Sequence, residues 1–243
     1  MLTGKKLVWT AMLLVVIMVL IAGCTQPATP AGEPAESETP SSVEEGTEAP
    51  QTYKIGIVQI VEHPALDSAR EGFIEGLKDE GFVEGDNVVF DFKNAQGEMA
   101  TAVTISEGFV ADKVDLILAI ATPCAQAAAT ATDEIPVLIT AVTDPVEAGV
   151  VKSLEKPGTN VTGTTDMNPV KEQLELIKEI NPAVQNVGVI YNSSEVNSVV
   201  QVNMAKNVAP GLGINIVEAV ATNSGEVGTA AESLVGKVDA IYL

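Results

Sequence analysis

The sequence predicts an α/β protein built from two doubly wound parallel-sheet lobes, with the second lobe truncated. Short runs that are apolar throughout alternate with segments of helical spacing, which is typical of a parallel sheet covered on both faces. The same order of elements begins again near residue 187. The folded part follows a leader of different composition, so the chain divides into four regions: 1–23, 24–52, 53–163 and 164–243.

Residues 1–23 have the features of an export signal. Lys5 and Lys6 precede an apolar run at 7–21, and small residues lead to Cys24, a pattern like the lipidation site of bacterial lipoproteins. A transmembrane helix is the alternative, but a span needs about 20 apolar residues and this run is shorter. We therefore expect a bacterial protein lipid-anchored through Cys24 on the outer side of the cell membrane.

Residues 24–52 predict a disordered tether. This stretch is rich in Pro, Thr, Ser and Glu and contains no Lys or Arg, so it cannot bury enough apolar surface to fold. The formal net charge of the chain is −20. Nucleic acid is not an expected partner, because phosphate backbones require clustered basic side chains. Besides Cys24, only Cys124 is present, which excludes an intramolecular disulfide in the folded part and a cysteine-based metal site.

The first lobe, 53–163, contains five apolar runs separated by helical patterns. A helix is expected from 66 until Gly81 ends it. Two more helices are expected at 99–111 and 123–132, the second of them rich in alanine. The strands are expected at 54–60, 88–92, 114–120, 135–141 and 160–163.

The second lobe repeats the first. Residues 187–191 match 55–59, and 237–241 match 113–117, with a helix, a strand and a helix between them in both halves. The lobes are expected to join near 163–167, with a ligand cleft at the carboxyl ends of their strands. The matching strand of the second half ends at the last residue, so we expect the complete second lobe to require a longer chain.

Four segments resemble the substrate-binding lipoproteins of ABC transporters, nearest the tryptophan/tyrosine-type family with a type I periplasmic-binding-protein fold. They are Val61-Glu62-His63-Pro64-Ala65-Leu66-Asp67, Ala119-Ile120-Ala121-Thr122-Pro123, Thr140-Ala141-Val142-Thr143-Asp144-Pro145 and Val189-Ile190-Tyr191-Asn192-Ser193. The resemblance covers residues 53–243. It implies that two hinged lobes capture a small molecule, with an aromatic amino acid as the expected ligand, and deliver it to an ABC permease.

The expected ligand-binding residues follow the strands. The helices after Thr122 and Ser193 offer unpaired N–H groups to an α-carboxylate. Asp144 and Asp166 are candidates for the ammonium group, although each could instead cap a turn. His63 is expected to stack on or hydrogen-bond the ligand, or to be a plain loop residue. The complete set is His63, Pro64, Thr122, Thr143, Asp144, Asp166, Asn192 and Ser193.

Two other functions compete with transport. A lipoprotein of this fold could present its ligand to a membrane receptor as a sensor, and the sequence leaves this open. An enzyme is not expected. A thiolate pair between Cys124 and His63 would be required, and a cysteine in an alanine-rich helix is more simply a packing residue. The chain has no phosphate-binding Gly-x-x-x-x-Gly-Lys-Ser/Thr motif, which argues against the transporter's ATPase, and no dinucleotide-binding motif after the first strand. No metal and no cofactor are expected.

Overall fold

The computed structural model describes residues 52–243. The predicted signal peptide, Cys24 and nearly all of the predicted tether lie outside the described residues. None of the helices in the described part is both long and apolar enough to span a membrane.

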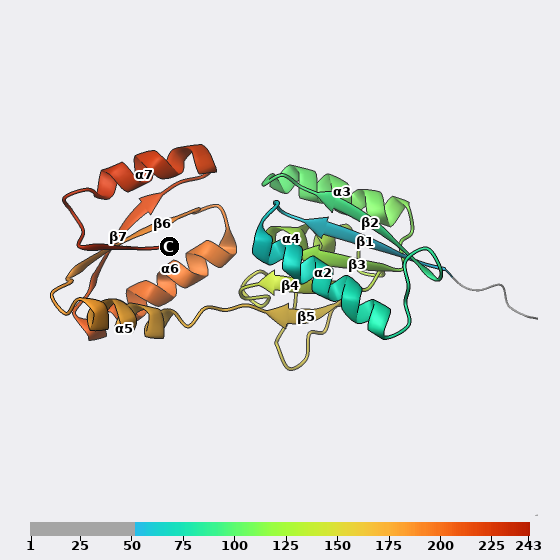
Figure 1. Cartoon of the computed structure of the whole chain (residues 1–243), viewed down its shortest axis with the longest axis horizontal. Helices are drawn as coiled ribbons and strands as arrows, with labels where there is room; N and C mark the ends of the chain where they lie inside the picture. Colours follow the sequence, from blue (N-terminus) through green and yellow to red (C-terminus); the bar gives the residue numbers. More distant parts are fainter. Residues whose placement is uncertain (1–51) are drawn as a thin grey trace, which may run out of the picture. The chain divides into compact units, whose positions relative to one another are not determined.

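The first lobe contains a five-stranded, fully parallel sheet in the order β2-β1-β3-β4-β5 (Figure 1). Its strands are β1 (Tyr53–Gln59), β2 (Val88–Asn94), β3 (Leu116–Ile120), β4 (Val137–Val142) and β5 (Val161–Thr165). Its helices are α2 (Pro64–Asp79), α3 (Met99–Ala111) and α4 (Thr122–Ala131).

Helices cover both faces of this sheet. On one face, α2 packs Phe73 and Ile74 against a cluster that contains Ile55 and Ile57. On the other face, α3 and α4 bury a second cluster that contains Phe109. Each buried strand therefore contacts an apolar layer on either side, which explains why its sequence is apolar throughout. The predicted doubly wound lobe is confirmed.

The second lobe contains a three-stranded parallel sheet in the order β7-β6-β8. Its strands are β6 (Asn186–Tyr191), β7 (Asn215–Val220) and β8 (Ala240–Tyr242), and its helices are α5 (Val170–Ile180), α6 (Val196–Val208) and α7 (Val227–Leu234), with short 3-10 helices at Ala209–Leu212 and Ser224–Glu226. Separate apolar clusters lie under α5 and α6 and under α7. The order β7-β6-β8 repeats β2-β1-β3, so the predicted repeat is confirmed over three strands.

The first strand of each lobe has a glycine at the same place, packed closely against a helix. A methyl group added to Gly56 would lie 2.7 Å from the Phe109 ring, and one added to Gly188 would lie 2.7 Å from Cδ1 of Leu234. In both lobes a glycine therefore lets the first strand approach a large side chain of a covering helix. Packing of this density leaves no room for an extra carbon.

An aspartate clamps the same strand of each lobe at its amino end. In the first lobe, the backbone N of Lys54 donates to Oδ2 of Asp115 over 2.7 Å, and the N of Asp115 donates back to the Lys54 carbonyl over 2.8 Å. In the second lobe, Asn186 and Asp239 form the same two bonds, both of 2.8 Å. The matching Lys-Val-Asp segments found in the sequence thus have one structural role.

Asp239 is expected to make the stability of the second lobe depend on pH. The N–H groups of Asn186 and then Gln185 donate to its carboxylate and lower its pKa. A lowered pKa stabilises the fold above the unfolded-state value, and this contribution is lost as the pH falls below about 4. In thermal unfolding between pH 7 and 3, Asp239→Asn should be less stable than the wild type at pH 7, with a difference that shrinks toward pH 3. A constant difference would contradict the prediction.

Several element boundaries differ from the sequence-based prediction, among them those of β3, β5 and α6. β3 begins at Leu116 rather than at residue 114, because Asp115 serves as the clamp. β5 extends to Thr165 rather than ending at residue 163, so Gly163 lies inside the strand. α6 begins at Val196, three residues after Ser193.

Candidate functional site

The candidate site lies at the carboxyl ends of the strands. Because the sheet is parallel, the loops after β1, β3, β4 and β5 share one edge. α2 leaves this edge over one face of the sheet and α4 over the other, so the direction of the covering helices switches between β1 and β3, and open parallel sheets bind ligands at such a switch point. The structure brings six predicted residues to this edge: His63, Pro64, Thr122, Thr143, Asp144 and Asp166.

The amino end of α4, the predicted carboxylate seat, has an unusual backbone conformation. Its N-cap residue is Ala121, which supplies no side-chain cap and has a φ of 82° and a ψ of 155°, a conformation that L-residues rarely adopt. Pro123 lacks an N–H, and Thr122 is only 2% exposed. Strained backbone of this kind is concentrated at binding sites. The helix end therefore presents N–H groups that no side chain of α4 satisfies.

Asp144 and Asp166 differ in how their carboxylates are used. Oδ1 of Asp144 accepts hydrogen bonds from the backbone N of Val146 and of Glu147, both over 3.0 Å, so this side chain caps a turn. Asp166 is exposed, and its own N donates to the Val142 carbonyl over 3.2 Å. Its carboxylate makes no hydrogen bond with the residues that the structure describes. Asp166 thus has a free charge at the edge, whereas Asp144 already has a structural role.

His63 is the N-cap of α2, which gives its ring a defined orientation. Nδ1 accepts a hydrogen bond from the N of Ala65 over 3.2 Å, and the ring is exposed. Because Nδ1 accepts, the proton of the neutral imidazole lies on Nε2. His63 therefore presents an N–H donor outward at the end of β1.

In the second lobe, Asn192 and Ser193 follow β6. Asn192 donates from Nδ2 to Glu195 over 2.9 Å and accepts from the N of Ser194 over 3.0 Å, so it shapes this loop. Glu195, rather than Ser193, is the N-cap of α6. A carboxylate at this position disfavours a second anion, which makes α6 a poorer carboxylate seat than α4.

Sequence reasoning missed three residues beside the first loop: Gln59, Asp67 and Arg70. Gln59 is fully buried at the end of β1, and its amide connects to the other two side chains. The hydrogen bond from Gln59 is the largest cause that lowers the pKa of Asp67, and Arg70 adds to it. A glutamine ending an apolar strand was the available signal, because a buried amide requires partners.

The catalytic alternative has no structural basis in the described residues. Cys124 is fully buried in the first-lobe core, and burial raises the pKa of its thiol to about 12. His63 caps an exposed helix start and forms no hydrogen bond with Cys124. The thiolate pair weighed from the sequence is therefore not formed.

Cys124 is expected to resist alkylation in the folded protein. In a Cys24→Ser chain this is the only thiol, and at pH 8 almost none of it is ionised or accessible. Iodoacetamide labelling followed by mass spectrometry should show no adduct under native conditions and complete reaction in concentrated urea. Rapid native labelling would show that the thiol is reactive after all.

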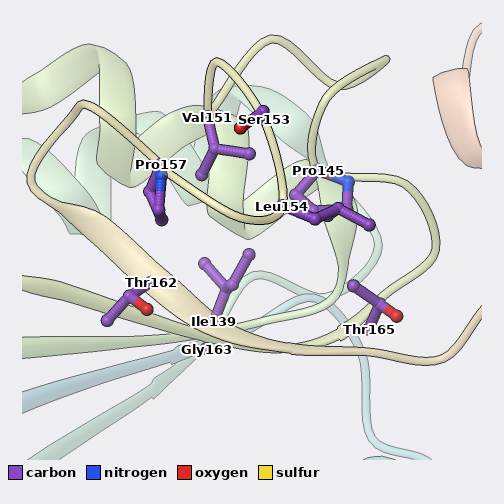
Figure 2. A pocket seen from close by; sticks show the side chains of 9 residues that line it. All are labelled: Ile139, Pro145, Val151, Ser153, Leu154, Pro157, Thr162, Gly163 and Thr165. Atoms are coloured by element: carbon purple, nitrogen blue, oxygen red, sulfur yellow. The ribbon is translucent and has the colours of Figure 1, made fainter.

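A small, shallow hollow lies beside the edge strand β5, under the loop that contains Leu154 and Pro157 (Figure 2). Its wall also contains Ile139, Pro145 and Val151, with hydroxyl groups from a serine and two threonines, and no charged side chain. A zwitterionic ligand requires charged or unpaired polar partners. This hollow is therefore not the candidate site.

Known proteins are similar to this chain in both sequence and fold. The sequence profile of the "ABC transporter substrate binding protein" family matches residues 54–243. The chain is 45% identical over 243 residues to a tyrosine-binding protein of Clostridioides difficile (strain R20291). The match covers all of this chain and 68% of that protein. A solved conserved domain protein of Vibrio cholerae has a TM-score of 0.77 and 49% identity, with 79% of this chain and 65% of that one covered.

A second solved structure is an ABC domain from Streptococcus pneumonia in complex with L-Trp. It has a TM-score of 0.76 and 42% identity over 79% of this chain and 64% of that one. The present chain thus spans about two thirds of the length of these relatives. The profile match over the described lobes, together with the 45% identity, shows that the chain belongs to the family of ABC transporter substrate binding proteins.

Proposed function

We propose that this protein binds an aromatic L-amino acid outside the cytoplasm and delivers it to an ABC permease, without converting it chemically. The observation that carries the proposal is the 45% identity to a tyrosine-binding protein. The L-Trp complex of a second relative supports the same ligand class. The loops at the carboxyl edge of the first sheet supply groups suited to such a ligand.

A zwitterion requires donors for its carboxylate and acceptors for its ammonium. The N–H groups at the start of α4 suit the carboxylate, because the helix dipole adds partial positive charge there. Asp166, or Asp144 through the oxygen that does not cap the turn, suits the ammonium. His63 offers its Nε2–H, and Asn192 and Ser193 are the candidate contacts from the second lobe.

Isothermal titration calorimetry tests this function. We expect L-Tyr or L-Trp to bind, and we expect L-Leu, a hexose and a nucleoside to give no comparable heat. Tyramine, which is tyrosine without the carboxylate, and 3-(4-hydroxyphenyl)propionate, which is tyrosine without the ammonium, should bind much more weakly than L-Tyr. Tight binding of a sugar or nucleoside without a response to amino acids would overturn the ligand class.

We also propose that Cys24 carries the lipid that holds the protein on the membrane. The support is the basic, apolar and small-residue order of residues 5–24. Cys24→Ser should abolish incorporation of labelled palmitate in a bacterial host and leave either a soluble or an unprocessed form. Persistence of the label on the Ser variant would refute this acceptor.

A further inference from the structure

A partly buried polar network adjoins the first candidate ligand loop. Gln59 ends β1 and is fully buried. Its Nε2 donates to the Val61 carbonyl over 2.8 Å and to Oδ1 of Asp67 over 2.9 Å, while its Oε1 accepts from Nη1 of Arg70 over 3.0 Å. A single amide thus connects the loop to two charged side chains of α2.

Arg70 is the only arginine of the chain, and its guanidinium interacts with side chains of the same lobe. Nη1 also donates to Oδ1 of Asp67 over 3.0 Å, and the guanidinium lies 4.2 Å from the centre of the Phe92 ring on β2. The side chain is only 18% exposed. A planar guanidinium can stack and donate twice, which an ammonium cannot do in this geometry. Arg70 therefore connects β1, β2 and α2.

The network fixes the path of the chain between β1 and His63. The Val61 carbonyl is held by Gln59, and the Ile60 carbonyl accepts from the N of Gly97 over 2.6 Å. At the other end of the loop, the N of Asp67 donates to the His63 carbonyl over 2.9 Å. Asp67 thus lies in the first turn of the helix that His63 caps, and its carboxylate faces Gln59.

We propose that Gln59, Asp67 and Arg70 are positioning residues that hold the loop at residues 60–63 in the conformation that ligand binding requires. This inference rests on the proposed function, because it assigns His63 and Pro64 to the ligand site. The physical reason is that a buried amide with three hydrogen bonds has few alternative arrangements. Removing it leaves the Val61 carbonyl and part of Arg70 without partners, which frees the loop.

Two matched variants separate positioning from general stability. Gln59→Met removes the amide at the carboxyl edge of the first sheet. Asn160→Leu removes an amide that donates to the carbonyls of Thr132 and Ile135 over 3.0 and 2.7 Å at the opposite, amino-terminal edge. Both are measured in the full chain by calorimetry with L-Tyr and L-Trp and by amide hydrogen exchange. We expect Gln59→Met to weaken binding by ~10-fold or more and to speed exchange in residues 60–66, while Asn160→Leu does neither.

A charge exchange supplies a rescue test. Gln59→Glu places a second carboxylate against Asp67 and should impair binding and loop protection. Adding Asp67→Asn lets the new amide at residue 67 donate to the new carboxylate at residue 59, and that carboxylate can still accept from Arg70. The double variant should therefore recover part of the ligand affinity and part of the loop protection. Arg70→Lys should resemble Gln59→Met, because the ammonium cannot make the two bonds while lying over Phe92. Failure of the second substitution to recover either readout would overturn the network.

The two readouts keep this inference distinct from the proposed function. If the wild type binds neither L-Tyr nor L-Trp, the proposed ligand class fails, and hydrogen exchange alone decides whether the network holds the loop. Unchanged exchange at residues 60–66 in Gln59→Met would overturn the positioning role. An equal loss of affinity in Gln59→Met and Asn160→Leu would also overturn it, because the effect would then be a general loss of stability.

Discussion

Replacing Gly163 with alanine is expected to disrupt the pairing of β4 with β5 and to destabilise the first lobe by about 4 kcal/mol or more. The added methyl group would lie 2.0 Å from the carbonyl oxygen of Ile139, which is backbone and cannot rotate away. Gly163 also has a φ of 152°, which side chains strongly disfavour. The register between β4 and β5 shifts just beyond this contact, so the close approach belongs to an irregular pair.

Urea unfolding followed by circular dichroism measures this effect, with Gly108→Ala as the control. Gly108 lies inside α3, is exposed, and has no atom near the position of an added methyl group. Alanine should therefore stabilise that helix by about 0.5 to 1 kcal/mol. If Gly163→Ala unfolds at the same urea concentration as the wild type, the close approach of the two strands is wrong.

Substitution of the ammonium partner is expected to have the largest effect on binding. Loss of the residue that holds the ligand ammonium should cost ~2 to 5 kcal/mol of affinity for L-Tyr or L-Trp, because one charge of the bound ligand is left unpaired. The candidates are Asp144 and Asp166. For Asp166, both Asp166→Ala and Asp166→Asn should show the loss if its carboxylate is the partner.

Asp144 requires a different comparison because it also caps a turn. Asp144→Asn keeps an oxygen that can accept from the N–H groups of Val146 and Glu147, whereas Asp144→Ala removes the cap as well as the charge. If Asp144 binds the ammonium, both variants lose affinity in calorimetry. If it only shapes the loop, Asp144→Asn keeps wild-type affinity and Asp144→Ala alone is impaired. Unchanged affinity in all variants of both residues would remove the ammonium assignment.

The sequence alone determined the doubly wound architecture, the internal repeat and the edge that carries the candidate site. These features follow from local patterns, because a parallel strand buried on both faces must be apolar throughout and its helix must show one apolar face. The positions of Thr122 and Asp144 followed as well, since each lies in the loop after a predicted strand, and Asp166 lies in the predicted crossing between the lobes. The glycines and aspartates that match in the two halves are part of the repeat in the sequence, whereas their contacts follow from the fold.

Only the tertiary structure decided what individual polar groups do. Gln59 ends a strand in the sequence, but its role depends on Asp67 and Arg70, which approach it only when α2 packs on the sheet. The sequence already favoured packing over chemistry for Cys124, but only the fold shows that this side chain is fully buried, which raises the pKa of its thiol to about 12. Local pattern specifies which side of an element is apolar, whereas partners, burial and pKa depend on segments that are distant in the chain and meet only in the fold.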